Sequence, residues 1–188
     1  MTTRWLFLLL IIFLGLQRLA ELRRSSRNER RILERGGHEY AAGQFRVMKF
    51  LHTAWFIAML AEVFGLQRPF HPTLALIAAL AFLAGQALRY IAIYTLGERW
   101  TVRVMILPGA QPISQGIYRF IRHPNYLGVI LEIGAVPLLH SAYFTAIFFS
   151  VANALLLFWR IRTEEAALEE HNNYEQVFTG RPRFLPKI

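Results

Sequence analysis

Apolar residues gather in five long runs, and this pattern predicts most of the fold. A helix rises about 1.5 Å per residue, so about 20 apolar residues cross a hydrocarbon core of about 30 Å. The second and third runs reach that length, whereas the last two are shorter and are joined by Pro137-Leu-Leu-His-Ser141. We expect these two to form a helical hairpin, with one bent re-entrant segment as the alternative. The predicted spans cover residues 5–22, 47–66, 73–95, 126–139 and 142–159.

The first run is short for a membrane span unless Arg18 lies at its edge. We expect the Arg18 side chain to extend its guanidinium to the membrane interface. Gln17 and Arg18 follow the apolar stretch where a signal peptide would have small residues at a cleavage site, so we read the run as a retained transmembrane helix. The segment 23–45 that follows is predicted to be a charged surface helix that breaks at Gly36-Gly37.

Basic residues are distributed very unevenly between the two sides of these spans. Seventeen of the 21 Lys and Arg residues fall in the connections on one side and in the C-terminal tail, against only Arg4 and Arg68 on the other. Cytoplasmic loops of membrane proteins are enriched in Lys and Arg. The N-terminus is therefore predicted outside and the C-terminus in the cytoplasm. The net charge of +9 is explained by topology, and we expect no nucleic-acid partner.

Composition supports a membrane protein and removes several kinds of site. The 188 residues are 55% hydrophobic, with a mean hydropathy of +0.33, which is typical of a polytopic membrane protein. The chain has no cysteine, which excludes disulfides, thiolate catalysis and cysteine–zinc sites. The six histidines show no metal-ligand spacing, so we expect no metal. The fold class is all-α and integral to the membrane.

A first polar cluster interrupts the apolar pattern at Gly116-Ile-Tyr-Arg-Phe-Ile-Arg-His-Pro-Asn-Tyr-Leu-Gly128. Pro124 can serve as the first residue of the fourth span, where its missing N–H costs nothing. The free amide groups of that helix start favour a carboxylate, and Arg122 and His123 add donors beside them. The plainer interpretation is an interfacial cap in which arginine meets lipid phosphate.

A second polar cluster, Arg160-Ile-Arg-Thr-Glu-Glu165, follows the last span on the same predicted side. On a helix that continues from this span, Arg160 can pair with Glu164, and Arg162 with Glu165. A solvated charged face is the common alternative. The tail from Tyr174 to Pro186 is stiffened by two prolines and can fold back over the membrane mouth. Together, the two clusters and the tail predict one site.

Polar residues inside the spans are a further clue, because ionisable groups are expensive in a bilayer. Glu132 and Asn153 lie at similar predicted depth and could pair. These side chains either join helices to one another or line a pocket for a lipid. The set comprises Glu62, Gln86, Arg89, Glu132 and Asn153.

These motifs resemble those of the isoprenylcysteine carboxyl methyltransferase family. The resemblance rests on Gly116 to Gly128, on Arg160 to Glu165 and on Leu96-Gly-Glu-Arg-Trp-Thr101, with the tail spacing of Tyr174, Pro182 and Pro186. The resemblance covers residues 94–188, which are expected to form a cofactor-binding methyltransferase core that includes the last two spans. Residues 1–93 are expected to hold three spans and a basic loop.

The resemblance implies a membrane methyltransferase that uses S-adenosylmethionine in a cytoplasm-facing pocket closed by the tail, with a lipophilic acceptor entering from the lipid. The implied catalytic residues are Glu165, His123 and Arg183. The implied cofactor-binding residues are Tyr118, Arg122, His123, Tyr126, Gly128 and Glu164. We expect Glu132, Asn153 and Trp100 to line the acceptor end.

Two departures from the family pattern bear on the acceptor. Val177 stands where a second tail tyrosine is usual, and Gly180 where a basic residue is expected, although Arg181 is adjacent. A prenylcysteine carboxylate needs a cation, whereas a lipid hydroxyl needs a base. The sequence therefore favours a hydroxyl acceptor. The Arg-His-Pro-Asn-Tyr variant is similar to bacterial inner-membrane members associated with type III polyketide synthases, which methylate alkylpyrone or alkylresorcinol lipids.

Three other functions stay open at this stage. One is carboxyl methylation of a prenylcysteine-like substrate. The second is an NADPH-dependent reductase, because the C-terminal part of sterol reductases is similar. The third is a membrane protein without catalysis, such as a transporter or scaffold, although we find no internal repeat of the transporter kind.

Overall fold

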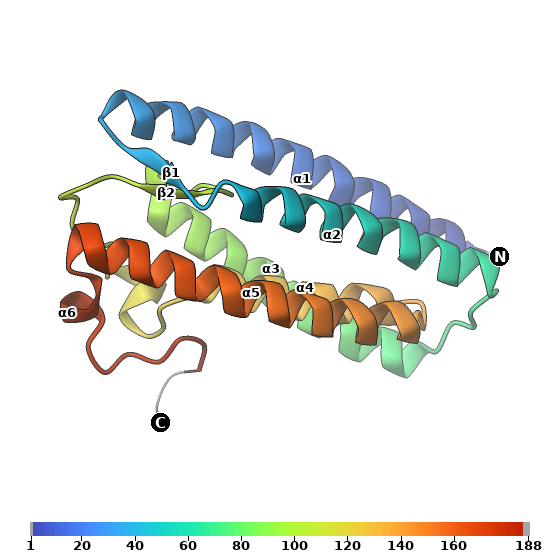
Figure 1. The fold of residues 1–188 in the computed structure, drawn as a ribbon. Coiled ribbons are helices and arrows are strands. Elements are labelled where there is room, and N and C mark those ends of the chain that lie inside the picture. The colour runs from blue at the N-terminus through green and yellow to red at the C-terminus, as the bar shows by residue number, and fades with distance from the viewer. Residues whose placement is uncertain (1, 186–188) are drawn as a thin grey trace.

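The computed structural model describes residues 2–185 and is a bundle of long helices, with the N-terminus and the C-terminal tail near opposite ends (Figure 1). Pro186 of the predicted tail lies outside the described residues. The helices longer than one or two turns are α1 (Thr2–Glu34), α2 (Gly43–Leu60), α3 (Pro72–Leu96), α4 (Pro124–Leu138) and α5 (Tyr143–Asn172), and α6 (Tyr174–Phe178) is short.

Five apolar helices are present among residues 2–185, which confirms the predicted all-α membrane class. The helices α1, α3 and α5, and α2 with its continuation to Gly65, are long and apolar enough to cross a membrane, and α4 is a shorter apolar helix. Leu9, Ile77 and Phe148 on their outer faces are each more than 60% exposed, as expected of side chains that face lipid tails. The last two helices form the predicted hairpin, with a turn at residues 139–142.

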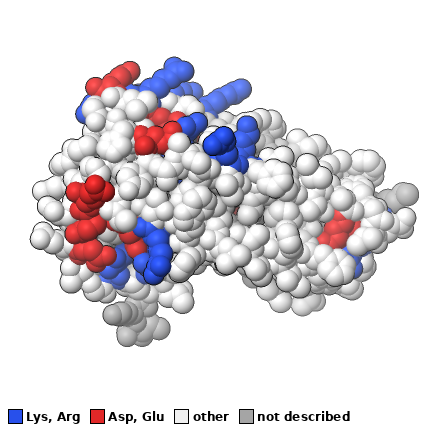
Figure 2. All heavy atoms as spheres, viewed as in Figure 1, with Lys and Arg blue, Asp and Glu red and all other residues white. Residues whose placement is uncertain are grey.

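Charged side chains gather at one end of the bundle. Figure 2 shows most of the visible charges where β1, β2 and α6 lie, and a broad uncharged band between them and a small group at the other end. The strand β1 (His38–Tyr40) pairs antiparallel with β2 (Val104–Ile106). We call the end of the bundle that contains β1, β2 and α6 the charged end.

The first helix is longer than its apolar run. Its 33 residues make a helix of about 50 Å, more than the hydrocarbon core requires. Residues 23–34 of the predicted charged segment therefore continue this helix, whereas residues 38–40 form β1 and α2 begins at Gly43. The first helix ends at Glu34, just before the predicted break at Gly36-Gly37.

At the opposite end, Glu62 joins two helices. It lies in η1 (Ala61–Gly65), one π-helical turn that continues α2. Its carboxylate accepts hydrogen bonds from the N–H groups of Phe144 (3.1 Å) and Thr145 (2.7 Å) at the start of α5, and Arg68 Nη2 donates to it at 2.8 Å. A carboxylate at a helix start satisfies free amides and complements the helix dipole. Glu62 therefore joins helices.

The helices α3 and α4 cross closely at Gly85 and Gly128. A Cβ atom added at Gly128 would lie 2.6 Å from the Gly85 carbonyl oxygen and 2.5 Å from Cγ of Arg89. Only glycine lets the two backbones pack this tightly. Gly128, predicted to bind the cofactor, is thus placed at a helix crossing.

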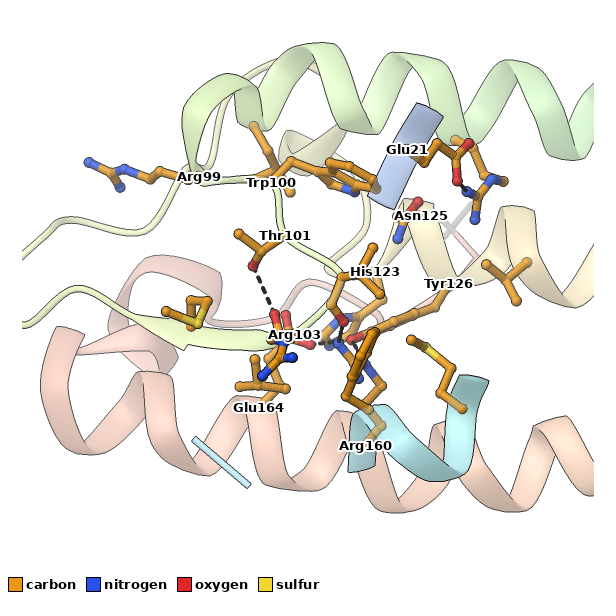
Figure 3. A pocket seen from close by; sticks show the side chains of 18 of the residues that line it. Glu21, Arg99, Trp100, Thr101, Arg103, His123, Asn125, Tyr126, Arg160 and Glu164 are labelled. Carbon is orange, nitrogen blue, oxygen red and sulfur yellow. Dashed lines mark hydrogen bonds and ion pairs between the residues drawn. The ribbon is translucent and has the colours of Figure 1, made fainter. Parts of the chain in front are cut away.

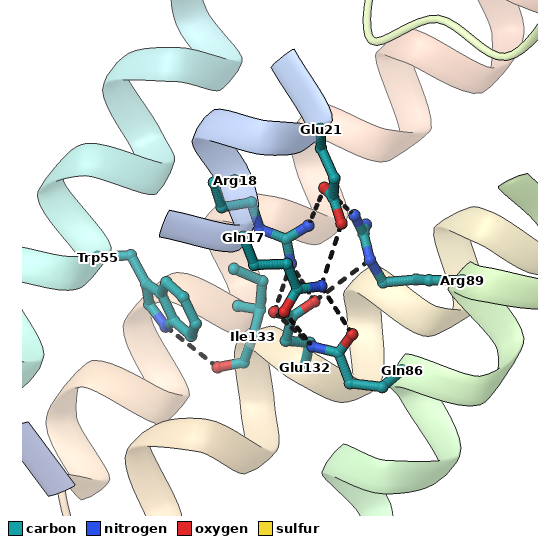
Figure 4. A network of polar contacts seen from close by, with 8 residues as sticks. All are labelled: Gln17, Arg18, Glu21, Trp55, Gln86, Arg89, Glu132 and Ile133. Carbon is teal, nitrogen blue, oxygen red and sulfur yellow. Dashed lines mark hydrogen bonds and ion pairs between the residues drawn. The ribbon is translucent and has the colours of Figure 1, made fainter. Parts of the chain in front are cut away.

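Between α1, α3 and α4 lies a group of paired ions (Figure 4). Arg18 bonds both Glu21 (2.5 Å) and Glu132, and Arg89 Nη2 donates to Glu21 at 2.6 Å. Gln17 and Gln86 bond each other at 2.9 Å and complete the set. We call these six residues the ion cluster.

The ion cluster corrects two predictions. Arg18 turns inward instead of reaching the interface, because the carboxylate of Glu132 is 2% exposed and a buried charge needs a partner. Glu132 pairs with Arg18 from α1 and not with Asn153, because depth along a helix does not determine which face a side chain occupies.

Candidate active site

A cavity of about 650 Å³ runs from the charged end into the bundle. Figure 3 shows Trp100, His123, Tyr126, Arg160 and Glu164 around its polar end, which we call the mouth. Further in, the lining becomes apolar and is bordered by Arg18, Glu21 and Arg89 of the ion cluster. The apolar lining includes Leu16, Leu19, Phe56, Val129, Leu156 and Leu157.

The structure brings the two polar clusters together at the mouth. Nε2 of His123 lies 2.9 Å from Glu165 Oε1, and the Tyr126 hydroxyl donates to Glu164. Arg160 Nε in turn donates to the Tyr126 oxygen at 2.7 Å. Residues of the α4 start and of α5 thus form one network, as predicted from their shared side of the membrane.

The pairs predicted within α5 are wrong. The Tyr126 hydroxyl lies between Arg160 and Glu164 and bonds both, whereas Arg162 lies over the Phe158 ring, 4.8 Å from its centroid. Tyr126 of α4 replaces the predicted contact of Arg160 with Glu164, and Glu165 bonds His123 and Arg183 in place of Arg162.

The turn before α4 positions Tyr118. It lies in η3 (Gly116–Arg119), and Gly116 adopts a φ of +57°, a conformation that favours glycine. Tyr118 is buried and lines the cavity. Burial raises the pKa of its phenol well above the ordinary value, so it stays protonated and can donate a hydrogen bond.

The tail folds back onto the start of α4, as the stiff sequence predicted. The N–H groups of Arg122 and His123 donate to the carbonyls of Pro182 and Arg183, both at 3.0 Å. These two amides therefore do not serve as the expected anion site. The first intrahelical hydrogen bond of α4 runs from Leu127 N–H to His123 O at 3.1 Å. The amides of Asn125 and Tyr126, which precede Leu127 in the first turn, therefore have no acceptor within the helix.

Side chains reinforce this contact. Arg183 donates to both carboxylate oxygens of Glu165, at 3.0 and 2.5 Å, and this hydrogen bonding raises the pKa of the Arg183 guanidinium. Arg122 Nε donates to Arg181 O at 2.8 Å, and Arg122 Nη1 to Glu175 at 3.3 Å. Glu165 thus holds both His123 and the tail.

The segment from Trp100 to Val102 covers the cavity. It follows η2 (Gly97–Arg99), and Asn28 of α1 donates to the Trp100 carbonyl at 2.8 Å. Val102 N–H donates to Ser25 Oγ at 2.8 Å, and Arg160 bonds the Val102 carbonyl. The Trp100 ring, predicted to contact the acceptor, is buried and lines the cavity.

Several polar atoms of the cavity lining have no hydrogen-bonding partner among residues 2–185. They include Nε1 of Trp100 and the side-chain oxygens of Asn125 and Asn153. Buried polar atoms are nearly always satisfied, so unsatisfied ones along a cavity are available to a bound ligand or to water. Asn125 was missed in the sequence, although it stands within the first motif between His123 and Tyr126.

The predicted site residues divide into two groups. Tyr118, Arg122, His123, Tyr126 and Glu164 line the cavity, as do Trp100 and Asn153. The others lie behind the lining formed by the described residues: Gly128 at the helix crossing, Glu132 in the ion cluster, and Glu165 and Arg183 between His123 and the tail.

Comparison with known proteins identifies the family. The family model for isoprenylcysteine carboxyl methyltransferases matches residues 74–170. The uncharacterized protein YpbQ of Bacillus subtilis is 36% identical over 167 residues, which cover 89% of this chain and 99% of that protein.

Two eukaryotic relatives match over about half of their own length. The protein-S-isoprenylcysteine O-methyltransferase of Schizosaccharomyces pombe is 30% identical over 58% of this chain and 49% of its own. Protein-S-isoprenylcysteine O-methyltransferase B of Arabidopsis thaliana is 29% identical over a segment that covers 52% of this chain and 47% of that protein. The matched segment contains both polar clusters of the mouth, and the chain belongs to the isoprenylcysteine carboxyl methyltransferase family.

Proposed function

We propose that the protein transfers a methyl group from S-adenosylmethionine to the hydroxyl of a long-chain lipid of the alkylpyrone or alkylresorcinol class. One observation carries the proposal: a single cavity joins a polar mouth with unsatisfied groups to an apolar interior. Such a cavity fits a polar cofactor at one end and a lipid at the other. Methyltransferases of this family use S-adenosylmethionine.

The residues of the mouth fit that cofactor. Glu164 offers a carboxylate to an ammonium group, in a charge-assisted hydrogen bond, and Tyr126 already orients that carboxylate. Nε1 of Trp100 and Oδ1 of Asn125 supply one donor and one acceptor that are unsatisfied among the described residues. The first-turn amides of α4 supply a partial positive charge for a carboxylate.

The cofactor, when bound, supplies an electrophilic methyl group on a positively charged sulfur. The chain then has to align the acceptor oxygen with that methyl and exclude water, because alignment contributes most of the rate in such displacements. Trp100 covers the cavity, and Tyr118, Arg122 and His123 surround the mouth. We assign Glu165 and Arg183 to holding His123 and the tail in place.

The acceptor end supports a hydroxyl lipid over a prenylcysteine. Asn153 is 2% exposed, lines the cavity and has an unsatisfied oxygen among residues 2–185, suited to accept a hydrogen bond from a hydroxyl. An ionised carboxylate would instead need a cation. Arg18 and Arg89 are already engaged by Glu21, and the other cation of this part of the lining, Lys49, is exposed. The proposal includes a bacterial inner membrane with the charged end in the cytoplasm, following the distribution of basic residues.

Methyl transfer to defined lipids tests the proposal. Purified protein is incubated with radiolabelled S-adenosylmethionine and an alkylresorcinol, an alkylpyrone or a farnesylcysteine, and the products are separated. We expect a labelled methyl ether from at least one of the first two lipids. A methyl ester from farnesylcysteine without any ether would overturn the choice of acceptor.

A further inference from the structure

His52 lies on α2, outside the segment that matches the family, and no role was assigned to it from the sequence. Its side chain lines the apolar part of the cavity, together with Thr53 and Phe56 of the same helix. A histidine in an otherwise apolar lipid-binding region calls for an explanation, because it is polar and able to exchange a proton.

The hydrogen bonding of His52 fixes its tautomer. Nδ1 lies 2.9 Å from the carbonyl oxygen of Met48, one turn earlier in α2. A carbonyl only accepts hydrogen bonds, so Nδ1 must carry the hydrogen. In the neutral ring, Nε2 then holds a free lone pair. Over residues 2–185, the one hydrogen bond of this ring is the one made by Nδ1, so Nε2 can accept a proton.

The depth of His52 fits the acceptor end. Gln44 Nε2 on α2 donates to Thr163 Oγ1 on α5 at 2.9 Å, and both helices run from there into the bundle. At 1.5 Å per residue, His52 lies about 12 Å and Asn153 about 15 Å beyond this contact. Arg160, which bonds Tyr126 at the mouth, lies only about 5 Å beyond it. His52 and the unsatisfied Asn153 therefore border the same level of the cavity.

The charges of the ion cluster cancel one another. Arg18 and Glu21 of α1, Arg89 of α3 and Glu132 of α4 pair with one another. This part of the ion cluster supplies no net charge to hold His52 as an imidazolium before reaction. Lys49 of α2 also lines the cavity and adds a positive charge, which favours a neutral ring. The resting side chain is thus a base and not an acid.

We propose that His52 is the catalytic base that deprotonates the lipid hydroxyl, an inference that rests on the proposed function. The O–H bond breaks as its proton passes to Nε2 of His52, and the oxygen forms a bond to the methyl carbon. The carbon–sulfur bond of S-adenosylmethionine breaks, and its electron pair stays on sulfur. The products are a methyl ether, S-adenosylhomocysteine and an imidazolium, which loses its proton to water when the cavity opens.

Other bases at the mouth are less suitable. Glu165 bonds His123 and receives two hydrogen bonds from Arg183, and these contacts hold its carboxylate behind the cavity lining. His123 is tied to Glu165 and stacks on Tyr126, with ring centroids 5.4 Å apart, at the end assigned to the cofactor. His52 is the histidine of the cavity lining on the acceptor side.

Acceptor acidity gives a sharp test. The substitution His52→Asn retains an N–H that can donate to Met48 O but removes Nε2. General-base catalysis contributes about 100-fold or more, so the rate with an alkylresorcinol should fall by about that factor. A 4-hydroxy-2-pyrone is a vinylogous acid that ionises without help, so its methylation should change by less than about threefold. His71→Asn, at an exposed histidine before α3, is the matched control and should leave both rates unchanged.

Outcomes with the two lipids separate this inference from the proposed function. Unimpaired methylation of the resorcinol by His52→Asn would overturn the inference while leaving the function intact. An equal loss with both lipids would also overturn it, since a packing defect does not discriminate by acidity. If the wild-type protein methylates neither lipid, the proposed function fails first.

A second readout does not depend on turnover. In protein carrying ¹⁵N-histidine, with the signal of His52 assigned by its loss in His52→Asn, Nε2 should show the shift of an unprotonated nitrogen. Addition of alkylresorcinol without cofactor should move that signal, because the hydroxyl donates to Nε2. A protonated Nε2, or no change at saturating resorcinol, contradicts the role of His52.

Discussion

The ion cluster and the mouth are both built from charged residues on separate helices, yet they differ in what remains unsatisfied. In the ion cluster, the carboxylates of Glu21 and Glu132 are engaged by Arg18 and Arg89. Nε of Arg89 makes no hydrogen bond among the described residues, but it lies 3.6 Å from the Glu132 carboxylate and so keeps an opposite charge beside it. At the mouth, Trp100 and Asn125 keep polar atoms without a partner among the described residues. A network in which each charge has an opposite charge beside it stabilises the fold, whereas polar atoms without a partner along a cavity are available to a ligand.

Removing one carboxylate from the ion cluster should have the largest effect. Glu132→Ala leaves Arg18 with only Glu21 and removes the carboxylate 3.6 Å from Arg89 Nε. Breaking a buried ion pair costs about 3–5 kcal/mol, so we expect a large loss of thermal stability in detergent. The control is Glu98→Ala, whose pairs with Arg31 and Arg35 are about half exposed and contribute about 0–1 kcal/mol. Equal stability of the two variants would remove the distinction between the two regions.

Neutralising Glu164 should affect binding without a comparable effect on folding. Glu164→Gln loses the charge that we assign to the cofactor's ammonium, and a hydrogen bond to a charged group contributes about 1.5–3 kcal/mol. The dissociation constant for S-adenosylhomocysteine should therefore rise by about tenfold or more, as measured by calorimetry. Glu170→Gln, at an exposed position of α5, is the control. Unchanged affinity in a folded Glu164→Gln protein would return Glu164 to a surface role.

Gly128 belongs to neither network, and its substitution shows which region it serves. In Gly128→Ala, the new methyl would collide with the Gly85 carbonyl, and such overpacking costs about 1–3 kcal/mol. Gly134→Ala on the same helix meets only Ser150 Oγ at 3.4 Å and should be neutral. Lower stability with retained cofactor affinity supports a packing role. Lost affinity at normal stability would instead place Gly128 with the mouth.

The two regions also differ in how far the sequence predicted them. Helix positions followed from the apolar runs, and the meeting of the two polar clusters followed from two motifs at span ends on one side. The partners of Arg18 and Glu132 did not follow, because hydropathy gives depth but not the rotation of a helix about its axis. The contact of Tyr126 with Arg160 was missed for the same reason.

The central claim is that the mouth binds S-adenosylmethionine. Calorimetric titration of detergent-solubilised protein with S-adenosylmethionine, S-adenosylhomocysteine and NADPH tests it most directly. We predict saturable binding of both methyl cofactors in the micromolar range and none of NADPH. Saturable binding of NADPH, with no heat from either methyl cofactor, would contradict the account and favour a reductase.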